Sequence, residues 1–310
     1  MKRSQIEVAG IKFKNPVIAA SGTFGYGSEY SELVDLEKIG GFVTKSITLK
    51  PTSGNRSPRI CEVAGGMLNS IGLQNEGLDY FLKEKLPLLR DVKTNVIVSI
   101  AGFNEKEYVE MAAVLNREKG ICAIELNLSC PNVKDGKGGN TGVLHFAQDK
   151  KVLYSVVRNV KRKSKIPIMV KLTPNVTDIT ILAKTASDAG ADALTLINTP
   201  LGMAVDINKK KPKIKSVIGG LSGPAIKPIA LRMLWQAANA VKIPLIGVGG
   251  ISTWEDALEF MLCGAALVQV GTASFIDPDT LVNIAEGIEK YAEKNNLESV
   301  QQIVGGLILE

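Results

Sequence analysis

The sequence has few of the residues that build metal sites and disulfide frameworks. Its 310 residues include four cysteines and a single histidine. Cys61, Cys122, Cys130 and Cys263 show neither the C-x-x-C spacing of a metal site nor the dense pattern of a small secreted protein. No apolar run reaches the roughly 18 residues of a membrane span, and no apolar signal segment follows the first residues. We therefore expect a cytoplasmic protein without a metal site or a membrane anchor.

Aromatic residues and unbalanced charge are also scarce. Aromatic side chains make up 5% of the chain, and 37 Lys and Arg against 31 Asp and Glu leave a net charge of +6. The basic residues cluster only at 158–165 and 209–215, and neither cluster has a nucleic-acid-binding motif or interleaved aromatic residues. Solvated surface explains both clusters, although the second could also touch an anion or a partner. We expect no nucleic-acid function.

The sequence does contain a regular alternation of two patterns. From residue 16 onward, short apolar runs rich in Val and Ile alternate with longer stretches of helical periodicity, as in repeated βα units. The runs are almost continuously apolar, which is typical of a parallel sheet covered on both faces. Strands are predicted at 16–20, 41–46, 95–100, 121–128, 167–172, 191–197, 244–248 and 265–270. Helices are predicted at 105–119, 150–164, 178–189, 227–242, 253–263 and 280–293.

Eight strands in this order favour an α/β fold of the closed (β/α)8 TIM-barrel type, which typically needs about 250 residues. We expect one domain over residues 1–310, with an open doubly wound sheet as the alternative. The connections 48–75 and 199–223, after the second and sixth strands, are too long for ordinary βα loops. Together with the Gly-rich segment 135–140 after the fourth strand, we interpret them as insertions that cover an active site.

Two lysines stand at the ends of apolar strands, where the active site of such a barrel forms. An unpaired buried ammonium is costly, so Lys45 and Lys171 are each expected to meet a ligand or a carboxylate. The plainer alternative is a lysine whose head group reaches solvent at the rim. Other polar or small residues at strand ends are Ser21, Ser46, Ser99, Asn127, Asn198, Thr199, Gly249, Gly250, Gly271 and Thr272.

Glycine-rich turns follow the seventh and eighth predicted strands, at 247–252 and 270–274. Glycine lets main-chain N–H groups approach phosphate oxygens, and many barrels bind phosphate at this place. A single glycine pair is more simply a tight turn. Two such turns after these two strands favour a ligand that carries phosphate.

Cys130 lies in the segment NLSCPNVK at residues 127–134, directly after the fourth predicted strand. It could serve as nucleophile, metal ligand, redox thiol or general base; His145 is the only histidine that could assist a nucleophile, and further metal ligands are absent. A general base needs only to face the substrate, which favours that role. Cys122 and Cys263 are expected to pack in the core, and Cys61 is ambiguous.

Several motifs in one order resemble the class 1, cytosolic dihydroorotate dehydrogenases. They are ASGTFG at 20–25, TKS at 44–46, NSIGLQN at 69–75, NLSCPN at 127–132, KLTP at 171–174, INT at 197–199, GGLSG at 219–223, GVGG at 247–250 and GT at 271–272. The resemblance spans nearly the whole chain. It implies one flavin mononucleotide (FMN) per chain and oxidation of (S)-dihydroorotate to orotate, a step of de novo pyrimidine synthesis.

The resemblance also assigns residues to roles. It implies flavin contacts from Ser21, Lys45, Ser46, Ser99, Asn127, Lys171, Ile197, Gly223, Gly249, Gly250, Gly271 and Thr272. It implies substrate contacts from Lys45, Asn69, Ser70, Ile71, Gly72, Leu73, Asn127, Asn198 and Thr199. Cys130 takes the position of the catalytic base, with Lys45 and Lys171 as further catalytic groups. Ser99 departs from the asparagine expected at its position.

The residues of the motifs at 69–75 and 130–139 are most similar to those of the NAD-linked subclass. That subclass implies a partner subunit carrying FAD and a 2Fe-2S cluster, and a homodimer within a heterotetramer. This chain has neither a cluster motif nor a G-x-G-x-x-G fingerprint after its first strand. The alternatives are the fumarate-using subclass, a flavoenzyme similar to dihydropyrimidine dehydrogenase, and a flavin-binding protein without catalysis.

Overall fold

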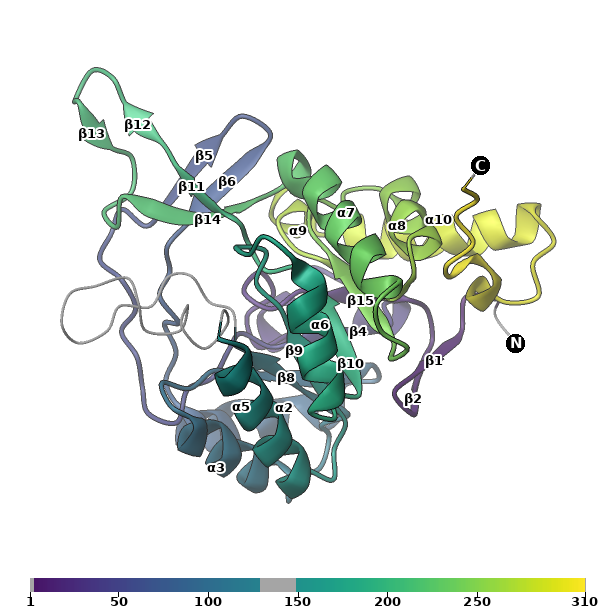
Figure 1. The fold of residues 1–310 in the computed structure, drawn as a ribbon, viewed down its shortest axis with the longest axis horizontal. Helices are drawn as coiled ribbons and strands as arrows, with labels where there is room; N and C mark the ends of the chain where they lie inside the picture. The colour runs from purple at the N-terminus through teal and green to yellow at the C-terminus, as the bar shows by residue number, and fades with distance from the viewer. Residues whose placement is uncertain (1–2, 129–148, 310) are drawn as a thin grey trace.

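The computed structural model describes residues 3–128 and 149–309. Its centre is a closed barrel of parallel strands, each hydrogen-bonded to the next (Figure 1). In cyclic order the strands are β3 (Val17–Ala19), β4 (Gly41–Val43), β7 (Asn95–Ile100), β8 (Ala123–Asn127), β9 (Ile168–Lys171), β10 (Ala193–Leu196), β15 (Leu245–Val248) and β16 (Ala265–Val270). The prediction of eight strands in a closed barrel is confirmed, and the open sheet is wrong.

Helices surround the barrel, as the periodicity predicts (Figure 1). The longer ones are α3 (Glu105–Leu115), α5 (Lys150–Lys163), α6 (Ile179–Asp188), α7 (Lys227–Ala238), α8 (Trp254–Leu262) and α10 (Thr280–Lys294). Several begin at side-chain caps: Asn104, Asp149, Asp178 and Thr253 accept hydrogen bonds from the first backbone N–H groups. Such caps satisfy backbone donors that have no partner inside the helix and so stabilise the helix starts.

Shorter elements complete the chain. A short helical stretch of α1 (Leu78–Tyr80), the π-helical η3 (Phe81–Lys85) and α2 (Leu86–Leu89) lies shortly before β7 in the chain. Other short helices within the described residues are η1 (Ser28–Tyr30), η2 (Leu36–Lys38), η4 (Pro224–Ile226), α9 (Ala273–Ile276) and η5 (Val300–Ile303). An antiparallel hairpin of β1 (Ile6–Val8) and β2 (Ile11–Phe13) precedes the barrel. Within the described ranges, no helix is long and apolar enough to cross a membrane.

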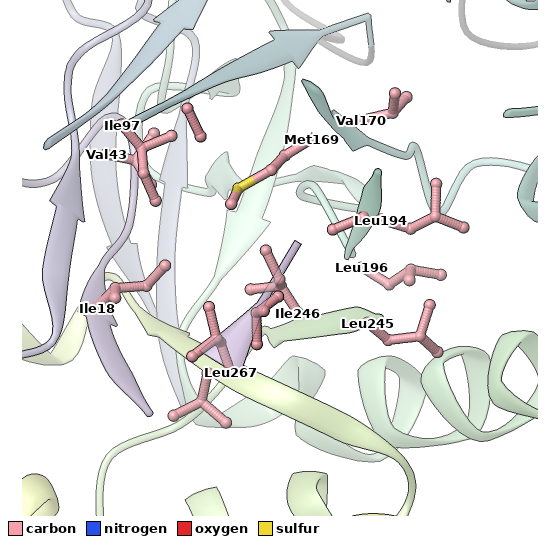
Figure 2. Close-up of a cluster of buried hydrophobic side chains, with 14 of the residues drawn as sticks. Ile18, Val43, Ile97, Met169, Val170, Leu194, Leu196, Leu245, Ile246 and Leu267 are labelled. Carbon is pink, nitrogen blue, oxygen red and sulfur yellow. The ribbon is translucent and has the colours of Figure 1, made fainter. Parts of the chain in front are cut away.

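Buried aliphatic side chains from many barrel strands form the core. Figure 2 shows Ile18, Val43, Ile97, Met169 and Leu267 among them, and each is fully buried. Burying one such side chain stabilises the fold by roughly 1.5–3 kcal/mol. The strands are therefore fixed from both faces, and their carboxyl ends form a rigid platform.

The two long insertions are not loops but halves of one small sheet. Strands β5 (Ile60–Val63) and β6 (Gly66–Asn69) come from the first insertion, and β11 (Leu201–Met203) and β14 (Ile218–Ser222) from the second. Their antiparallel order is β11-β14-β6-β5. A further hairpin, β12 (Val205–Asp206) and β13 (Lys211–Pro212), projects beyond this sheet (Figure 1). The third predicted insertion, at 135–140, lies outside the described residues.

Candidate active site

A cavity of about 300 Å³ lies between the carboxyl ends of the barrel strands and the small sheet of the insertions. Its walls carry most of the residues that the sequence assigns to cofactor or substrate. The lining includes Ser21, Lys45, Ser46, Asn69, Ile71, Gly72, Leu73, Asn127, Lys171, Ile197, Asn198, Thr199, Gly223, Gly249, Gly250, Gly271 and Thr272. Residues more than 200 positions apart in the sequence thus meet at one concave surface.

Two of the described site residues that the sequence predicts are not part of this lining. Ser99 is fully buried behind the wall, and its hydroxyl lies 2.8 Å from that of Ser46. Ser70 is also fully buried, and its hydroxyl donates a long, 3.5 Å hydrogen bond to the carbonyl of Arg59. Cys130 lies outside the described residues. The structure therefore places two of the predicted contacts behind the cavity wall.

Lys171 forms part of the cavity floor, and its partners are buried polar groups inside the barrel. Its Nζ donates to Oε1 of Gln269 at 3.3 Å and lies 3.9 Å from Oε1 of Glu125. The second carboxylate oxygen of Glu125 accepts hydrogen bonds from Gln269 Nε2 at 2.7 Å and from Thr195 Oγ1 at 3.1 Å. The expectation of a carboxylate beside Lys171 is confirmed.

The sequence analysis missed Glu125, Gln269 and Thr195, although a signal was present. Glu125 and Gln269 are polar residues in the middle of nearly continuous apolar strands. Side chains two positions apart on a strand point to the same side, so Glu125 shares its side with Asn127 at the strand end. A buried charge in such a place needs a partner of opposite charge.

Lys45 stands in a more open setting at the cavity wall. Its Nζ lies 3.1 Å from Oε2 of Glu76 and 4.8 Å from the centre of the Tyr26 ring. The Tyr26 hydroxyl donates to the same Glu76 oxygen at 2.9 Å. The carboxylate expected beside Lys45 is therefore Glu76. Neither Glu76 nor Tyr26 was identified from the sequence, since nothing in the pattern around them marks an interaction with Lys45.

Burial and the interactions among Lys45, Glu76 and Tyr26 shift the pKa values of Tyr26 and Glu76. Burial raises the pKa of Tyr26 well above its ordinary value, and its hydrogen bond to the negative Glu76 adds to the shift. Partial burial opposes ionisation of Glu76, but the hydrogen bonds from Lys45 and Tyr26 outweigh it and lower the pKa of Glu76 below 4.5. At neutral pH Glu76 is thus a carboxylate and Tyr26 a neutral phenol.

The glycines on the opposite wall allow the main chain to approach closely. Gly249 and Gly250 have φ values of 134° and 76°, and Gly223 has 103°, all in the region that other residues rarely adopt. A Cβ on Gly250 would lie 2.8 Å from the backbone nitrogen of Lys227, and one on Gly223 would lie 2.6 Å from the Cα of Gly66. At these three glycines the main chain itself faces the cavity without a side chain, which suits a phosphate group.

Amide side chains from separate strand ends gather on a further part of the wall. Asn198 Nδ2 lies 3.4 Å from Oδ1 of Asn127, and Asn127 Nδ2 donates to the Ser46 hydroxyl at 2.9 Å. Asn69 reaches this region from β6 of the small sheet. Amides both donate and accept hydrogen bonds, so this wall suits a flat ring with carbonyl and N–H groups.

The other described cysteines do not line the cavity. Cys122 precedes β8, its Sγ donates to the carbonyl of Val96, and burial raises its pKa to about 12. Cys263 ends α8, and burial also raises its pKa. Both pack against the hydrophobic core, as predicted. Cys61 is half-buried on β5.

Comparison with known proteins decides the family. The family model for dihydroorotate dehydrogenase matches residues 3–291. The chain belongs to the dihydroorotate dehydrogenase family. This assignment agrees with the resemblance drawn from its motifs and with the closed barrel.

Curated relatives in this family match the chain over nearly its full length. A protein of Geobacter sp. (strain M21), named dihydroorotate dehydrogenase B (NAD(+)), catalytic subunit, is 54% identical over 98% of each chain. Proteins with the same name are 54% identical in Geotalea uraniireducens (strain Rf4) and 50% identical in Caldicellulosiruptor bescii.

Among solved structures, the dihydroorotate dehydrogenase of Eimeria tenella in complex with ferulenol has the same fold. Its TM-score is 0.83 at 21% sequence identity, and the match covers 99% of this chain and 89% of the other. At this identity the likeness concerns the arrangement of strands and helices. It independently supports the barrel architecture of the family.

Proposed function

We propose that this chain is the catalytic subunit of an NAD+-linked dihydroorotate dehydrogenase that oxidises (S)-dihydroorotate to orotate in pyrimidine synthesis. The observation that carries this proposal is its 54% identity, over at least 97% of both chains, to relatives named as that subunit. The cavity supports it, because lysine ammonium groups, asparagine amides and glycine backbone all face the same space. We place the enzyme in the cytoplasm, with residues 1–310 acting as one FMN-binding domain.

The cavity fits FMN in its chemistry. Gly223, Gly249, Gly250, Gly271 and Thr272 would hold the phosphate, since their wall exposes main chain without bulky side chains. Lys171 would supply positive charge, with Ser21, Ser46, Asn127 and Ile197 as further contacts, and Ser99 would support Ser46 from behind. When bound, FMN would accept the hydride that dihydroorotate releases.

Substrate binding is assigned to the part of the wall that carries amides and Lys45. The Lys45 ammonium would attract the carboxylate of dihydroorotate, and amide groups would bind its ring. The amide and loop contacts are Asn69, Ile71, Gly72, Leu73, Asn127, Asn198 and Thr199, with Ser70 holding the loop from its buried position.

Cys130 is assigned as the base. Its thiolate would take the proton from ring carbon 5 while the hydride leaves ring carbon 6, so that orotate forms by loss of one proton and one hydride.

Replacement of Cys130 tests this role. Cys130→Ser should retain bound FMN but show flavin reduction by dihydroorotate slowed at least about 100-fold near pH 7, since a serine hydroxyl is a much weaker acid than a thiol and is hardly ionised to act as a base at that pH. Cys263→Ser is the matched control, because Cys263 packs on the core and should leave the rate unchanged. Rapid-mixing absorbance measures both variants, and an unaltered rate in Cys130→Ser would remove the base from the mechanism.

The acceptor assignment implies a second polypeptide. We propose a partner subunit carrying FAD and a 2Fe-2S cluster, joined to a homodimer of this chain in a heterotetramer. The isolated chain should therefore reduce artificial acceptors but turn over NAD+ only when the partner is added. Fast NAD+ reduction by the purified chain alone would contradict this, and efficient turnover with fumarate would favour the fumarate-using subclass.

Substrate choice separates dihydroorotate from neutral dihydropyrimidines. Lys45 favours a ring with a carboxylate, and dihydrouracil lacks one. Steady-state assays with both compounds should show a clear preference for dihydroorotate. Preference for dihydrouracil would instead indicate an enzyme similar to dihydropyrimidine dehydrogenase.

A further inference from the structure

The carboxylate of Glu125 is buried inside the barrel, directly beneath the cavity floor. Its side chain has no exposed surface, and it does not line the cavity. One oxygen, Oε2, accepts two hydrogen bonds, whereas Oε1 has no hydrogen-bond partner among the described residues. A buried carboxylate oxygen left in this state is costly, so its retention needs a reason.

The nearest cation to that oxygen is Lys171, held at a distance rather than in direct contact. The separation of 3.9 Å is too long for a hydrogen bond. The Gln269 amide joins the two groups instead, because its oxygen accepts from Lys171 and its nitrogen donates to Glu125. Lys171 therefore stands between a fixed negative charge below and the cavity above.

We propose that Glu125 is a positioning residue that limits the positive charge Lys171 presents to the flavin and so lowers the flavin's reduction potential. This role rests on the proposed binding of FMN in the cavity. The carboxylate offsets part of the lysine's field, and Gln269 and Thr195 fix its position within the barrel. The oxygen without a hydrogen bond, Oε1, is the one that faces Lys171, at 3.9 Å.

The direction of the change in reduction potential follows from the negative charge that reduction adds to the flavin. Oxidised FMN takes up one hydride, meaning two electrons and one proton, and the ring gains one negative charge. A cation near the ring favours the reduced form, and a buried anion behind that cation weakens the effect. Removal of the Glu125 charge should therefore make the flavin easier to reduce.

A purely structural role for Glu125 makes a different prediction. In that case, loss of the carboxylate would loosen the barrel interior, and so would loss of its hydrogen bond from Thr195. Thr195→Val removes that donor without changing any charge. It is therefore the matched control, since it disturbs the same network but leaves the electrostatics of the floor almost intact.

The test is the midpoint potential of FMN in the loaded protein at pH 6.5. Glu125→Gln should raise the equilibrium constant for two-electron reduction at least about tenfold, which is about 30 mV. Thr195→Val should stay within about threefold of wild type. Glu125→Met offers a second neutral replacement if Glu125→Gln does not fold, and should shift the potential in the same direction.

The outcomes separate this inference from the proposed function. A neutral variant whose potential is unchanged or lower than wild type overturns the role of Glu125. An equal rise in Thr195→Val also overturns it, because the network rather than the charge would then set the potential. Wild-type protein that binds no FMN, or whose FMN is not reduced by dihydroorotate, refutes the proposed function instead.

Discussion

The two lysines of the cavity hold similar charges in very different surroundings. Lys171 has 7% of its side chain exposed and faces Glu125, which has none. Lys45 has 28% exposed and faces Glu76, which has 46%. Yet the exposed pair is the closer one, at 3.1 Å against 3.9 Å. The distance between nitrogen and oxygen alone therefore does not show which ion pair is the stronger.

The difference is one of solvation. Water screens the Lys45 pair and can replace either partner, so that Lys45 would exchange Glu76 for the carboxylate of the proposed substrate at small cost. The Lys171 pair is dry, and each charge depends on the other. Lys171 and Glu125 thus hold fixed charges at the cavity floor, whereas Lys45 at the wall can change its partner. This contrast leads to three predictions of decreasing size.

Lys171→Met should give the largest loss of stability. It leaves the Glu125 carboxylate buried without a counter-charge, which typically costs about 3–5 kcal/mol. Urea unfolding of the flavin-free protein measures the loss. The double variant Lys171→Met/Glu125→Gln should recover most of it, because both charges are then absent. A double variant as unstable as the single one would show that packing rather than charge is responsible.

Lys45→Met should affect binding more than stability. Loss of a charged contact to a substrate carboxylate is worth about 1.5–3 kcal/mol, or roughly ten- to 100-fold in KM for dihydroorotate. Its free energy of unfolding should change by no more than about 1 kcal/mol, since the pair with Glu76 is exposed. If steady-state kinetics showed an unchanged KM, Lys45 would not bind the carboxylate.

Glu76→Gln should produce the smallest effect, visible as a change in acid sensitivity. The folded-state pKa of Glu76 lies below its ordinary 4.5, so its ionised form stabilises the protein above that pH. The contribution is lost as pH falls through the lowered value. Wild type should therefore exceed Glu76→Gln by up to about 1 kcal/mol at pH 7, and the gap should close below pH 4.5.

Thermal or urea unfolding at a series of pH values measures this gap. Tyr26→Phe serves as the matched variant, because it removes one donor to Glu76 while Lys45 remains. It should show a smaller pH-dependent difference from wild type than Glu76→Gln does. A gap that widened toward acid would contradict the lowered pKa.

Sequence reasoning was most successful where one pattern recurs along the chain. Eight apolar runs gave the strands, and residues at their carboxyl ends, such as Lys45 and Lys171, were placed at the cavity because parallel strands end on one side. The helices at 150–164 and 253–263 were predicted in the same local way, from apolar periodicity. These features depend on near neighbours in sequence.

The remainder depends on contacts between distant segments. Strands β6 and β14 pair Asn69 with Gly220, about 150 residues away, and neither strand is long enough to show its own periodicity. Ser99 follows the rule for strand ends, but Ser46 covers it. Glu76 becomes relevant only once the chain has folded it against Lys45. No pattern in the sequence specifies these three placements.

The most direct test of the whole account is anaerobic mixing of the purified, FMN-loaded chain with dihydroorotate while flavin absorbance is followed. The account predicts rapid loss of the oxidised flavin's visible absorbance, with one orotate formed for each flavin reduced. Persistent oxidised-flavin absorbance with saturating dihydroorotate, in protein that retains its FMN, would contradict it.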